Sequence, residues 1–342
     1  MPQVPVVVIG ASAGGVEALS RVVARLPADL NSCVLVVLHI PPTGPSALGA
    51  ILNRQGPLPA RTAVDGDPLV PGRVLVAPPN HHLMVVDGLA RLSVGPRENG
   101  HRPAIDVLFR TAAEARGPGV VAVVLSGLLD DGAAGAAAVR AHGGVVLVQD
   151  PEDAIYPAMP RTVIERIGPD AVANAEALAV LIGKWAGTMR GDTGAVEDPM
   201  ADESEHSGRA LRPPSGYICP DCSGTLYVVE DGALLRFRCR VGHAWGAENL
   251  LQQQGLSVEG ALWIALRTLE EKADLCRRLG ERAAHEGRTL TRDKFFETTA
   301  ETLASARAIK RLLESGTGGA HPLGDAVTAP DVAESAGMPD AS

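Results

Sequence analysis

The stretch VVVIGASAGG at residues 6–15 joins a run of β-branched residues to a cluster of small ones. The apolar residues at 6–9 do not alternate with polar ones, which predicts a strand buried on both faces of a sheet. A helix is predicted directly afterwards, over 15–25. The stretch therefore forms a strand, a tight turn and a helix, and Ser12 lies in the turn.

Predicted strands alternate with predicted helices through the first 188 residues, which indicates an α/β fold. We expect a doubly wound, mostly parallel sheet between two helix layers, a three-layer α/β/α arrangement. Residues 74–94 are expected to contain a hairpin-rich insertion. The further predicted strands are 33–38, 74–77, 83–86, 92–94, 120–125 and 145–148, and the further helices are 46–54, 105–114, 133–142 and two near Thr162 and Glu176.

Composition excludes several classes of protein. The 342 residues suggest about two domains, and 46% hydrophobic residues are enough for a packed core. A net charge of −9 with 3% aromatic residues argues against nucleic-acid binding. No apolar run approaches the roughly 20 residues of a membrane span, and no basic segment precedes the first strand as in a secretory signal. Three of the five cysteines cluster and two stand alone, which does not fit a disulfide framework, so we expect a cytoplasmic protein.

The chain divides into five predicted segments. An α/β catalytic domain at 1–188 is followed by an acidic flexible linker at 189–214, a Cys/His module at 215–246, a helical hairpin at 247–315 and a disordered tail at 316–342. Apolar residues at gaps of three and four indicate the two helices, with Gly287 between them. We expect an antiparallel hairpin, and the alternative is an oligomer formed by coiled-coil pairing through these helices.

Ser12 has the sequence context of a nucleophile. Gly-x-Ser-x-Gly between a strand and a helix exposes the serine hydroxyl, and amide groups at the helix N-terminus, including that of Ala13, can stabilise an oxyanion. A dinucleotide-binding loop is the first alternative, but it needs glycine at Ser12 and an acidic residue at the end of the second strand, where His39 stands. The second alternative is a serine that caps the helix.

His39 and Asp131 follow the ends of two other predicted strands. Carboxyl ends of parallel strands meet at one edge of a sheet, so His39 can reach Ser12 as a general base and Asp131 can orient the imidazole. The alternatives are a histidine hydrogen-bonded to backbone and an aspartate that caps the helix starting at Ala133. His82, His101 and Arg102 are expected to be ordinary polar or capping residues.

With these residues in place, residues 4–185 resemble the catalytic domain of the CheB-type protein-glutamate methylesterases of bacterial chemotaxis. The resemblance depends on several spaced motifs in the same order: VIGASAGG at 8–15, LHIPP at 38–42, APP at 77–79 with His82, LSGLLDDGAAG at 125–135, and QDP at 149–151 with Met159 and Pro160. The family frequently has threonine at Ala13 and glycine at Leu129, so these two positions depart from its pattern. No receiver domain is expected ahead of the catalytic region.

The resemblance implies a serine hydrolase that demethylates glutamate methyl esters on chemoreceptors and that also deamidates receptor glutamine. It implies Ser12 as nucleophile, His39 as base, Asp131 as orienting acid, and the backbone of Leu128 beside Ala13 in the oxyanion hole. No cofactor is expected for catalysis. The alternatives are a hydrolase of another ester in a non-motility signalling system, and a non-catalytic adaptor that recruits a partner such as a histidine kinase.

The cysteine cluster has the spacing of a zinc site. Two ligands in C-x2-C and two in C-x3-H suit tetrahedral zinc, and a module of roughly 30 residues needs such support to fold. The expected ligands are Cys219, Cys222, Cys239 and His243. Because all four positions are filled, the zinc is expected to be structural. A hairpin is predicted at 227–238, with the alternating Arg236, Arg238 and Arg240 on a solvated face.

Overall fold

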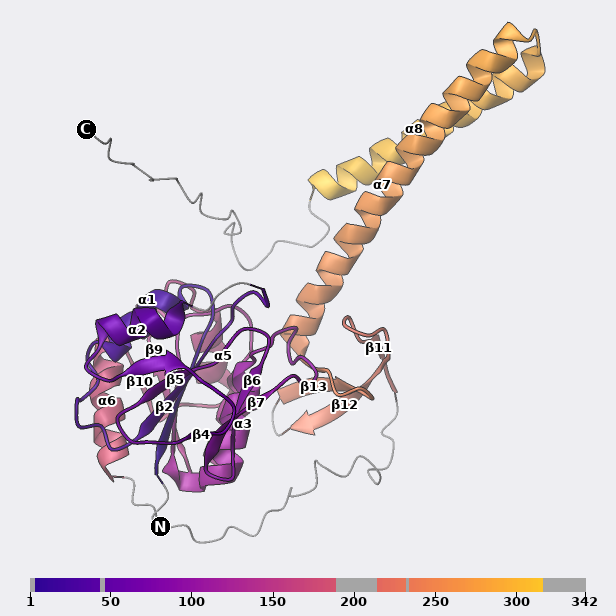
Figure 1. Cartoon of the computed structure of the whole chain (residues 1–342). Coiled ribbons are helices and arrows are strands. Elements are labelled where there is room, and N and C mark those ends of the chain that lie inside the picture. Colours follow the sequence, from indigo (N-terminus) through magenta and orange to yellow (C-terminus); the bar gives the residue numbers. More distant parts are fainter. Residues whose placement is uncertain (1–3, 44–46, 189–213, 232–233, 316–342) are drawn as a thin grey trace, which may run out of the picture. The chain divides into compact units, whose positions relative to one another are not determined.

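The structure is a computed structural model that describes residues 4–43, 47–188, 214–231 and 234–315 (Figure 1). It divides into two compact units, Met1–Gln252 and Gln253–Ser342. The expected linker at 189–214 lies outside the described residues except for Pro214, and the expected tail at 316–342 lies wholly outside them.

A seven-stranded parallel sheet forms the centre of the first unit, in the order β10-β9-β8-β1-β2-β5-β3. The strands are β1 (Val6–Ala11), β2 (Cys33–Leu38), β3 (Ala60–Thr62), β5 (Val74–Val76), β8 (Val120–Val124), β9 (Val145–Gln149) and β10 (Ala171–Ala173). Every residue of β1, β2 and β8 is buried, as their unbroken apolar runs predict. The predicted doubly wound sheet is confirmed.

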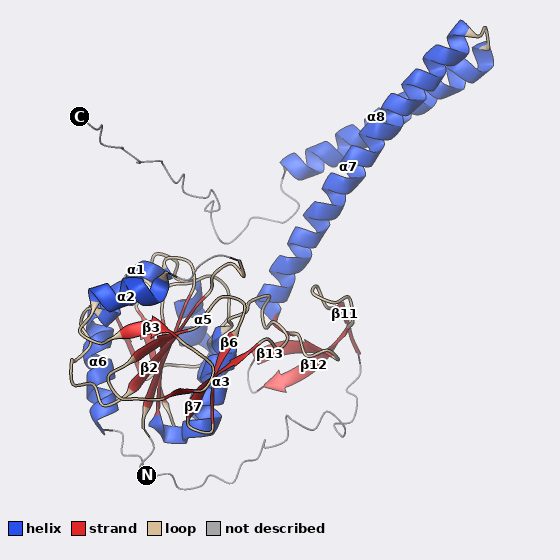
Figure 2. Ribbon diagram, viewed as in Figure 1, coloured by secondary structure: helices blue, strands red, loops and turns tan. Residues whose placement is uncertain are grey.

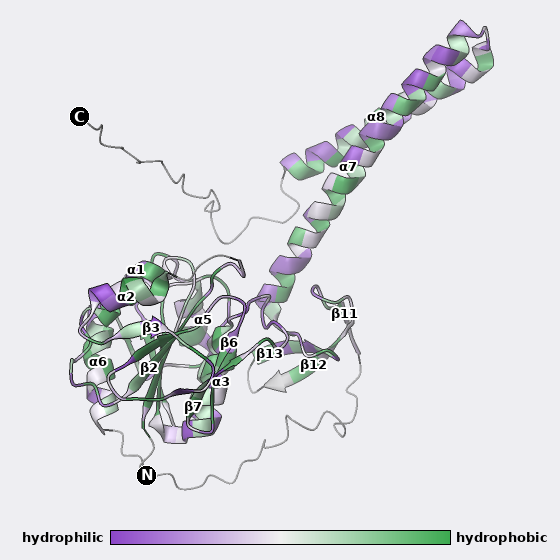
Figure 3. Ribbon diagram, viewed as in Figure 1, coloured by the Kyte–Doolittle hydropathy of each residue, from purple (hydrophilic) through white to green (hydrophobic). Residues whose placement is uncertain are grey.

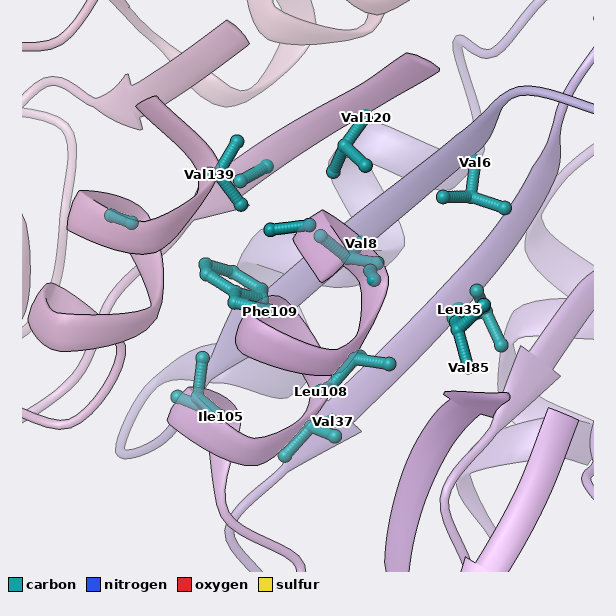
Figure 4. Packing of buried hydrophobic residues seen from close by; sticks show 14 of the residues in the cluster. Val6, Val8, Leu35, Val37, Val85, Ile105, Leu108, Phe109, Val120 and Val139 are labelled. Atoms are coloured by element: carbon teal, nitrogen blue, oxygen red, sulfur yellow. The ribbon is translucent and has the colours of Figure 1, made fainter. Parts of the chain in front are cut away.

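Helices cover both faces of this sheet (Figure 2). One layer holds α1 (Gly15–Val23), α2 (Leu48–Gln55) and α6 (Ala175–Thr188), and the other holds α3 (Ile105–Arg116), α4 (Ala133–Ala141) and α5 (Ala158–Arg166). Successive side chains of a strand point to opposite faces. Val6 and Val8 therefore belong to the core on the α3 side, where Val8 lies beside Leu108 and Phe109 (Figure 4), whereas Val7 and Ile9 belong to the core on the α1 side.

The predicted hairpin-rich insertion is a second, three-stranded antiparallel sheet in the order β4-β7-β6. Its strands are β4 (Asp67–Pro68), β6 (His82–Val86) and β7 (Leu89–Ser93). A short 3-10 helix at Gly117–Gly119 leads into β8. Three strands of the first 188 residues were not predicted from the sequence, namely β3, β4 and β10. They have only two or three residues each, too few for a hydrophobic pattern to develop.

The Cys/His module forms a four-stranded antiparallel sheet, β11-β12-β13-β14. The strands are β11 (Pro214–Ile218), β12 (Thr225–Asp231), β13 (Leu234–Cys239) and β14 (Ala244–Gly246). The predicted hairpin is β12 with β13, and β11 and β14 flank it. Its hydrophobic cluster has only six buried members: Cys219, Leu226, Phe237, Cys239, Trp245 and Leu250.

Two long helices complete the described chain, α7 (Ala247–His285) and α8 (Thr289–Glu314). They are joined at Gly287, whose φ of 72° ends the first helix in the left-handed region as the sequence indicates. Leu266 and Ala273 of α7 and Ala306 of α8 are buried. Apolar and polar residues are interspersed along both helices (Figure 3). None of the described helices has the length and apolar character needed to cross a membrane.

Candidate active site

The candidate site lies where the strand order of the sheet reverses. All strands of the sheet are parallel, but β2 lies on one side of β1 whereas β8 and β9 lie on its other side. The chain therefore leaves the carboxyl ends of β1 and β8 toward opposite sides. Open α/β sheets bind their ligands at this kind of switch point. Ser12 follows β1 and Ser126 follows β8, which places both residues at this position.

Ser12 is held in a tight turn by the loop after β8. Its amide donates to the Ser126 carbonyl over 2.9 Å, and the Ser126 hydroxyl donates to the Ala13 carbonyl over 2.8 Å. Gly14 has a φ of 70°, and a Cβ there would lie 2.7 Å from the Ser126 hydroxyl oxygen. The turn therefore needs glycine both for its backbone conformation and for the close approach of the two loops.

Ser12, His39 and Asp131 form a continuous chain of hydrogen bonds. Nδ1 of His39 lies 3.1 Å from Oγ of Ser12, and Nε2 lies 2.7 Å from Oδ2 of Asp131. Because the carboxylate can only accept, the ring proton resides on Nε2 and leaves Nδ1 free to accept the serine proton. The structure thus brings together the three side chains that were predicted from the strand ends.

Asp131 is enclosed by donors. Its carboxylate accepts from the amides of Ile105 at 2.7 Å and Asp106 at 3.3 Å, and from the side-chain amide of Asn99 at 2.9 Å. Burial would raise the pKa of Asp131, but its hydrogen bond to His39, the neighbouring imidazoles and the Ile105 amide hold the pKa well below the ordinary value. The carboxylate stays charged, as the orienting acid of an imidazolium must.

Asp131 caps a helix, as one alternative from the sequence held, but the helix is α3 and not α4, which starts at Ala133. Asp131 precedes α4, yet it caps the N-terminus of α3 through the amides of Ile105 and Asp106. Asp106 in turn caps α4 by accepting from the amides of Gly132 at 3.0 Å and Gly135 at 2.7 Å. Burial and the adjacent Asp131 charge raise the pKa of Asp106, because two anions so close together repel each other, and the nearby Arg236 guanidinium opposes this rise.

His101 stacks on the imidazole of His39, with ring centroids 3.7 Å apart and planes 12° apart. Burial and the neighbouring His39 lower the pKa of His101 to about 4, so its ring is neutral at physiological pH. His82 and Arg102 bind loop carbonyls, of Pro96 and of Val94 and Gly95 respectively, as expected of structural residues. His101 differs from them because it contacts the candidate base.

The two candidate oxyanion donors, Ala13 and Leu128, flank the serine. Among the described residues, neither backbone amide has a recorded acceptor. The Leu128 loop reaches Ser12, since a Cβ on Gly127 would lie 3.0 Å from Cβ of Ser12. Leu129 has a φ of 65°, so it adopts the left-handed conformation for which the family glycine is suited.

Cys219, Cys222, Cys239 and His243 are brought together as predicted. Their ligand atoms all lie within 4.8 Å of one another. Sγ of Cys222 is 3.6 Å from Sγ of Cys239, which is 3.5 Å from Nδ1 of His243. Zn–S bonds of about 2.3 Å in a tetrahedral site place the donor atoms roughly 3.8 Å apart. The donor–donor distances here are similar, so the four side chains can bind one zinc ion after small movements.

The expectation of a solvated arginine face on β13 was wrong. Arg236 is buried, and its guanidinium pairs with Glu98 at 3.2 Å and with Asp106 at 3.6 Å. Arg238 also pairs with Glu98, at 3.5 Å, and only Arg240 is exposed. The strand faces the α/β domain, where these buried acidic groups pair with its arginines, and a pattern within the strand does not reveal such a partner.

The sequence profile of the CheB methylesterase family matches residues 7–182, just over half of the chain. The chain belongs to this family. The family match covers the parallel sheet and all three residues of the Ser12–His39–Asp131 chain.

Relatives of the CheB family agree with the profile. A protein-glutamate methylesterase/protein-glutamine glutaminase of Methanosarcina mazei is 35% identical over 182 residues, covering 51% of this chain and 50% of the relative. One of Myxococcus xanthus is 42% identical over 163 residues, covering 46% of this chain and 47% of the relative. The chain thus spans about half the length of these relatives.

A solved CheB structure has the same fold. The crystal structure of the Thermotoga maritima CheB methylesterase catalytic domain superposes with a TM-score of 0.51 at 33% identity. The match covers 53% of this chain and 97% of that domain. The shared part is therefore a whole catalytic domain, and the Cys/His module and long helices lie outside it.

Asn99, His101 and Asp106 are residues of the candidate site that the sequence did not assign. Asn99 and Gly100 form a dipeptide typical of turns, which signals a loop but not its neighbours. Their loop precedes α3 and is distant in sequence from Ser12. Only the packing of α3 on the sheet brings it to Asp131 and His39.

Proposed function

We propose that this chain is a protein-glutamate methylesterase acting on methylated chemoreceptors or similar signalling proteins. The observation that carries the proposal is the hydrogen-bonded chain Ser12–His39–Asp131 at the switch point of the sheet. Named relatives with this activity support the substrate class. Deamidation of receptor glutamine is part of the proposal, because the same acyl transfer releases ammonia in place of methanol.

In the proposed reaction, Oγ of Ser12 adds to the ester carbonyl as Nδ1 of His39 takes the serine proton. The negative charge that develops on the carbonyl oxygen is stabilised by the amides of Ala13 and Leu128. The bond to the methoxy oxygen then breaks, and His39 returns the proton to release methanol. Water deprotonated by His39 hydrolyses the glutamyl ester on Ser12, which leaves glutamate and restores the hydroxyl.

Asp131 has a supporting role in this proposal. Its carboxylate fixes the tautomer of His39 through Nε2 and stabilises the imidazolium formed in each step. The reaction needs no cofactor, because side chains and backbone amides supply every proton transfer and charge. We assign zinc at the Cys/His module to folding, since four protein ligands complete its tetrahedron.

We place this activity in the cytoplasm. All five cysteines are free thiols, and three of them belong to the Cys/His cluster, which needs reduced sulfur. A histidine kinase or another regulator remains a proposed partner, as does self-association through α7 and α8.

The test is methanol release from methylated receptor fragments by the full-length protein and by Ser12→Ala. We expect release by the wild type and none by the variant, with unchanged circular dichroism. Labelling of Ser12 by a serine-reactive probe without methanol release would favour a hydrolase of another ester. A folded wild type with neither activity would favour the non-catalytic adaptor and overturn the proposal.

A further inference from the structure

Asn99 connects the Cys/His module to the candidate catalytic acid. It is 4% exposed, and both ends of its side-chain amide are used. Nδ2 donates to Oδ1 of Asp131 at 2.9 Å, and Oδ1 accepts from the Gly246 amide at 2.7 Å. Rotating the amide by 180° would place oxygen against carboxylate and N–H against N–H, so these partners fix its orientation.

The module side of this contact lies beside the zinc ligands. Gly246 ends β14, which begins directly after His243, and β14 pairs with β13, which ends in Cys239. The Cys239 amide donates to the His243 carbonyl over 3.0 Å and closes the turn between the two strands. Two of the four ligands therefore anchor both ends of the turn that positions Gly246.

A continuous backbone contact supports the side-chain bonds. The Asn99 amide donates to the Ala244 carbonyl at 2.8 Å, and the Ala244 amide donates to the Arg97 carbonyl at 3.3 Å. Asn99 itself has a φ of 53°, a conformation that asparagine tolerates better than most residues. Strand β14 thereby extends its hydrogen bonding into the loop that carries Asn99.

Charge and packing hold the module in place. Arg236, which lies opposite Gly246 in the β13–β14 register, pairs with the buried carboxylates of Glu98 and Asp106. Leu234 of β13 joins the hydrophobic core formed by α3 and the sheet. The fit is close, since a Cβ on Gly246 would lie 2.3 Å from Oδ2 of Asp130. Only glycine permits this approach.

We propose that Asn99 is a positioning residue through which the zinc-supported module orders the catalytic acid. With the module in place, Gly246 and Ala244 hold Asn99, which fixes Asp131 and through it the Nε2 proton of His39. When zinc is lost, the six-residue hydrophobic cluster is too small to keep β13 and β14 ordered. Asn99 then loses both backbone anchors. This inference depends on the role proposed for Asp131.

The test compares two matched glycine substitutions in the full-length, zinc-loaded protein. Gly246→Ala forces β14 away from Asp130, whereas Gly187→Ala on α6 adds a methyl group where nothing lies within 4 Å. The first readout is the downfield NMR signal of the His39 Nε2 proton, which reports its hydrogen bond to Asp131 without any substrate. The second is the rate at which a fluorophosphonate forms a P–O bond to Ser12 and releases fluoride.

We expect Gly246→Ala to retain zinc, to weaken or shift the imidazole signal, and to slow phosphonylation about 10-fold to 100-fold, the size of a lost hydrogen bond to a charged group. Asn99→Ala should do the same, and Gly187→Ala should match the wild type. Removal of zinc from the wild type by a chelator provides a third comparison, which does not depend on whether Gly246→Ala or Asn99→Ala folds, and the same signal loss is expected.

Two outcomes separate this inference from the proposed function. An unchanged imidazole signal and labelling rate in Gly246→Ala and in the zinc-free protein would overturn the coupling, while leaving the esterase intact. A wild-type protein that is not phosphonylated at Ser12 would instead contradict the proposed function itself. Zinc loss that unfolds the α/β domain, seen by circular dichroism, would also overturn the inference, because the module would then act on global stability.

Discussion

Asp106 and Asp131 each cap the N-terminus of the other's helix. Asp131 precedes α4 but caps α3, and Asp106 belongs to α3 but caps α4. This reciprocal capping clamps the two helix N-termini together at the candidate site. The carboxylate of Asp131 therefore has two duties, one toward His39 and one toward the α3 amides. Oδ2 serves both the imidazole and the Ile105 amide, whereas Oδ1 accepts from the Asp106 amide, so asparagine and alanine at this position remove these bonds to different extents.

Asp131→Asn should remove activity while keeping much of the stability. The asparagine oxygen in the place of Oδ1 still accepts from the Asp106 amide and from Asn99. Its NH2 group, in the place of Oδ2, faces both Nε2 of His39 and the Ile105 amide and favours the wrong tautomer. We expect methanol release to fall about 10⁴-fold. Asp131→Ala should be equally inactive and also less stable by about 1–3 kcal/mol, because buried amides lose their acceptor. Equal denaturation midpoints for the two variants would contradict the capping role.

His101→Phe and His101→Ala test the stacked pair. Phenylalanine keeps a flat ring against His39, so its rate of ester hydrolysis should stay closer to wild type than that of alanine, which leaves the imidazole room to rotate. An alanine variant as active as the phenylalanine variant would show that stacking does not hold His39.

The same residue predicts a pH dependence of stability. The pKa of His101 is lowered to about 4 from an ordinary 6.5, so the folded state resists protonation. The neutral His101 ring therefore contributes its full stabilisation above pH 6.5. As the pH falls from 6.5 toward 4, the free energy of unfolding decreases by about 3 kcal/mol, because the unfolded chain binds the proton more readily. His101→Phe should lack this loss. Parallel curves of unfolding free energy against pH for both proteins would refute the assignment.

The ion pairs of Glu98 predict that the free energy of unfolding also depends on pH, in a more acidic range. Burial would raise its pKa, but Arg110 and Arg236 outweigh burial and lower it to about 2 from 4.5. A lowered pKa stabilises the fold above pH 4.5, and this stability disappears as the pH falls toward 2. The difference in unfolding free energy between wild type and Glu98→Gln should therefore shrink as the pH is lowered from 5 to 3. A constant difference would count against the ion pairs.

Gly14 and Gly168 form a matched pair for the serine turn. Both have a φ near 70°, but a Cβ on Gly168 meets nothing within 4 Å, whereas one on Gly14 meets Ser126 at 2.7 Å. Gly168→Ala should lower stability by about 1 kcal/mol through backbone strain alone. Gly14→Ala should lower it further and also slow hydrolysis, since it displaces Ser126 from Ser12. If both variants hydrolyse ester at the wild-type rate, the turn does not depend on this contact.

The sequence predicted the parts of the fold that have strong local patterns. Unbroken valine runs identified β1, β2 and β8, and the residues at the ends of parallel strands placed Ser12, His39 and Asp131 at one edge. The very short strands β3, β4 and β10 were missed because two or three residues carry no period.

The surroundings of the candidate site could not be predicted in the same way. Asn99 and His101 sit in a loop whose position depends on the packing of α3. Arg236 alternates with Arg238 and Arg240, a pattern typical of a solvated strand face. Its burial depends on Glu98 and Asp106, which lie in the loop before α3 and in α3 itself. Long-range charge pairing leaves no mark in a local pattern, so these contacts require the folded structure.

The most direct test of Ser12 as nucleophile is to locate the adduct formed by a fluorophosphonate on the zinc-loaded, full-length protein. Peptide mass mapping should find one phosphonyl group on the peptide that contains Ser12. Labelling should be absent in Ser12→Ala and strongly slowed in His39→Gln, because the hydroxyl needs its base. An adduct elsewhere, or equal labelling of Ser12→Ala, would contradict the account.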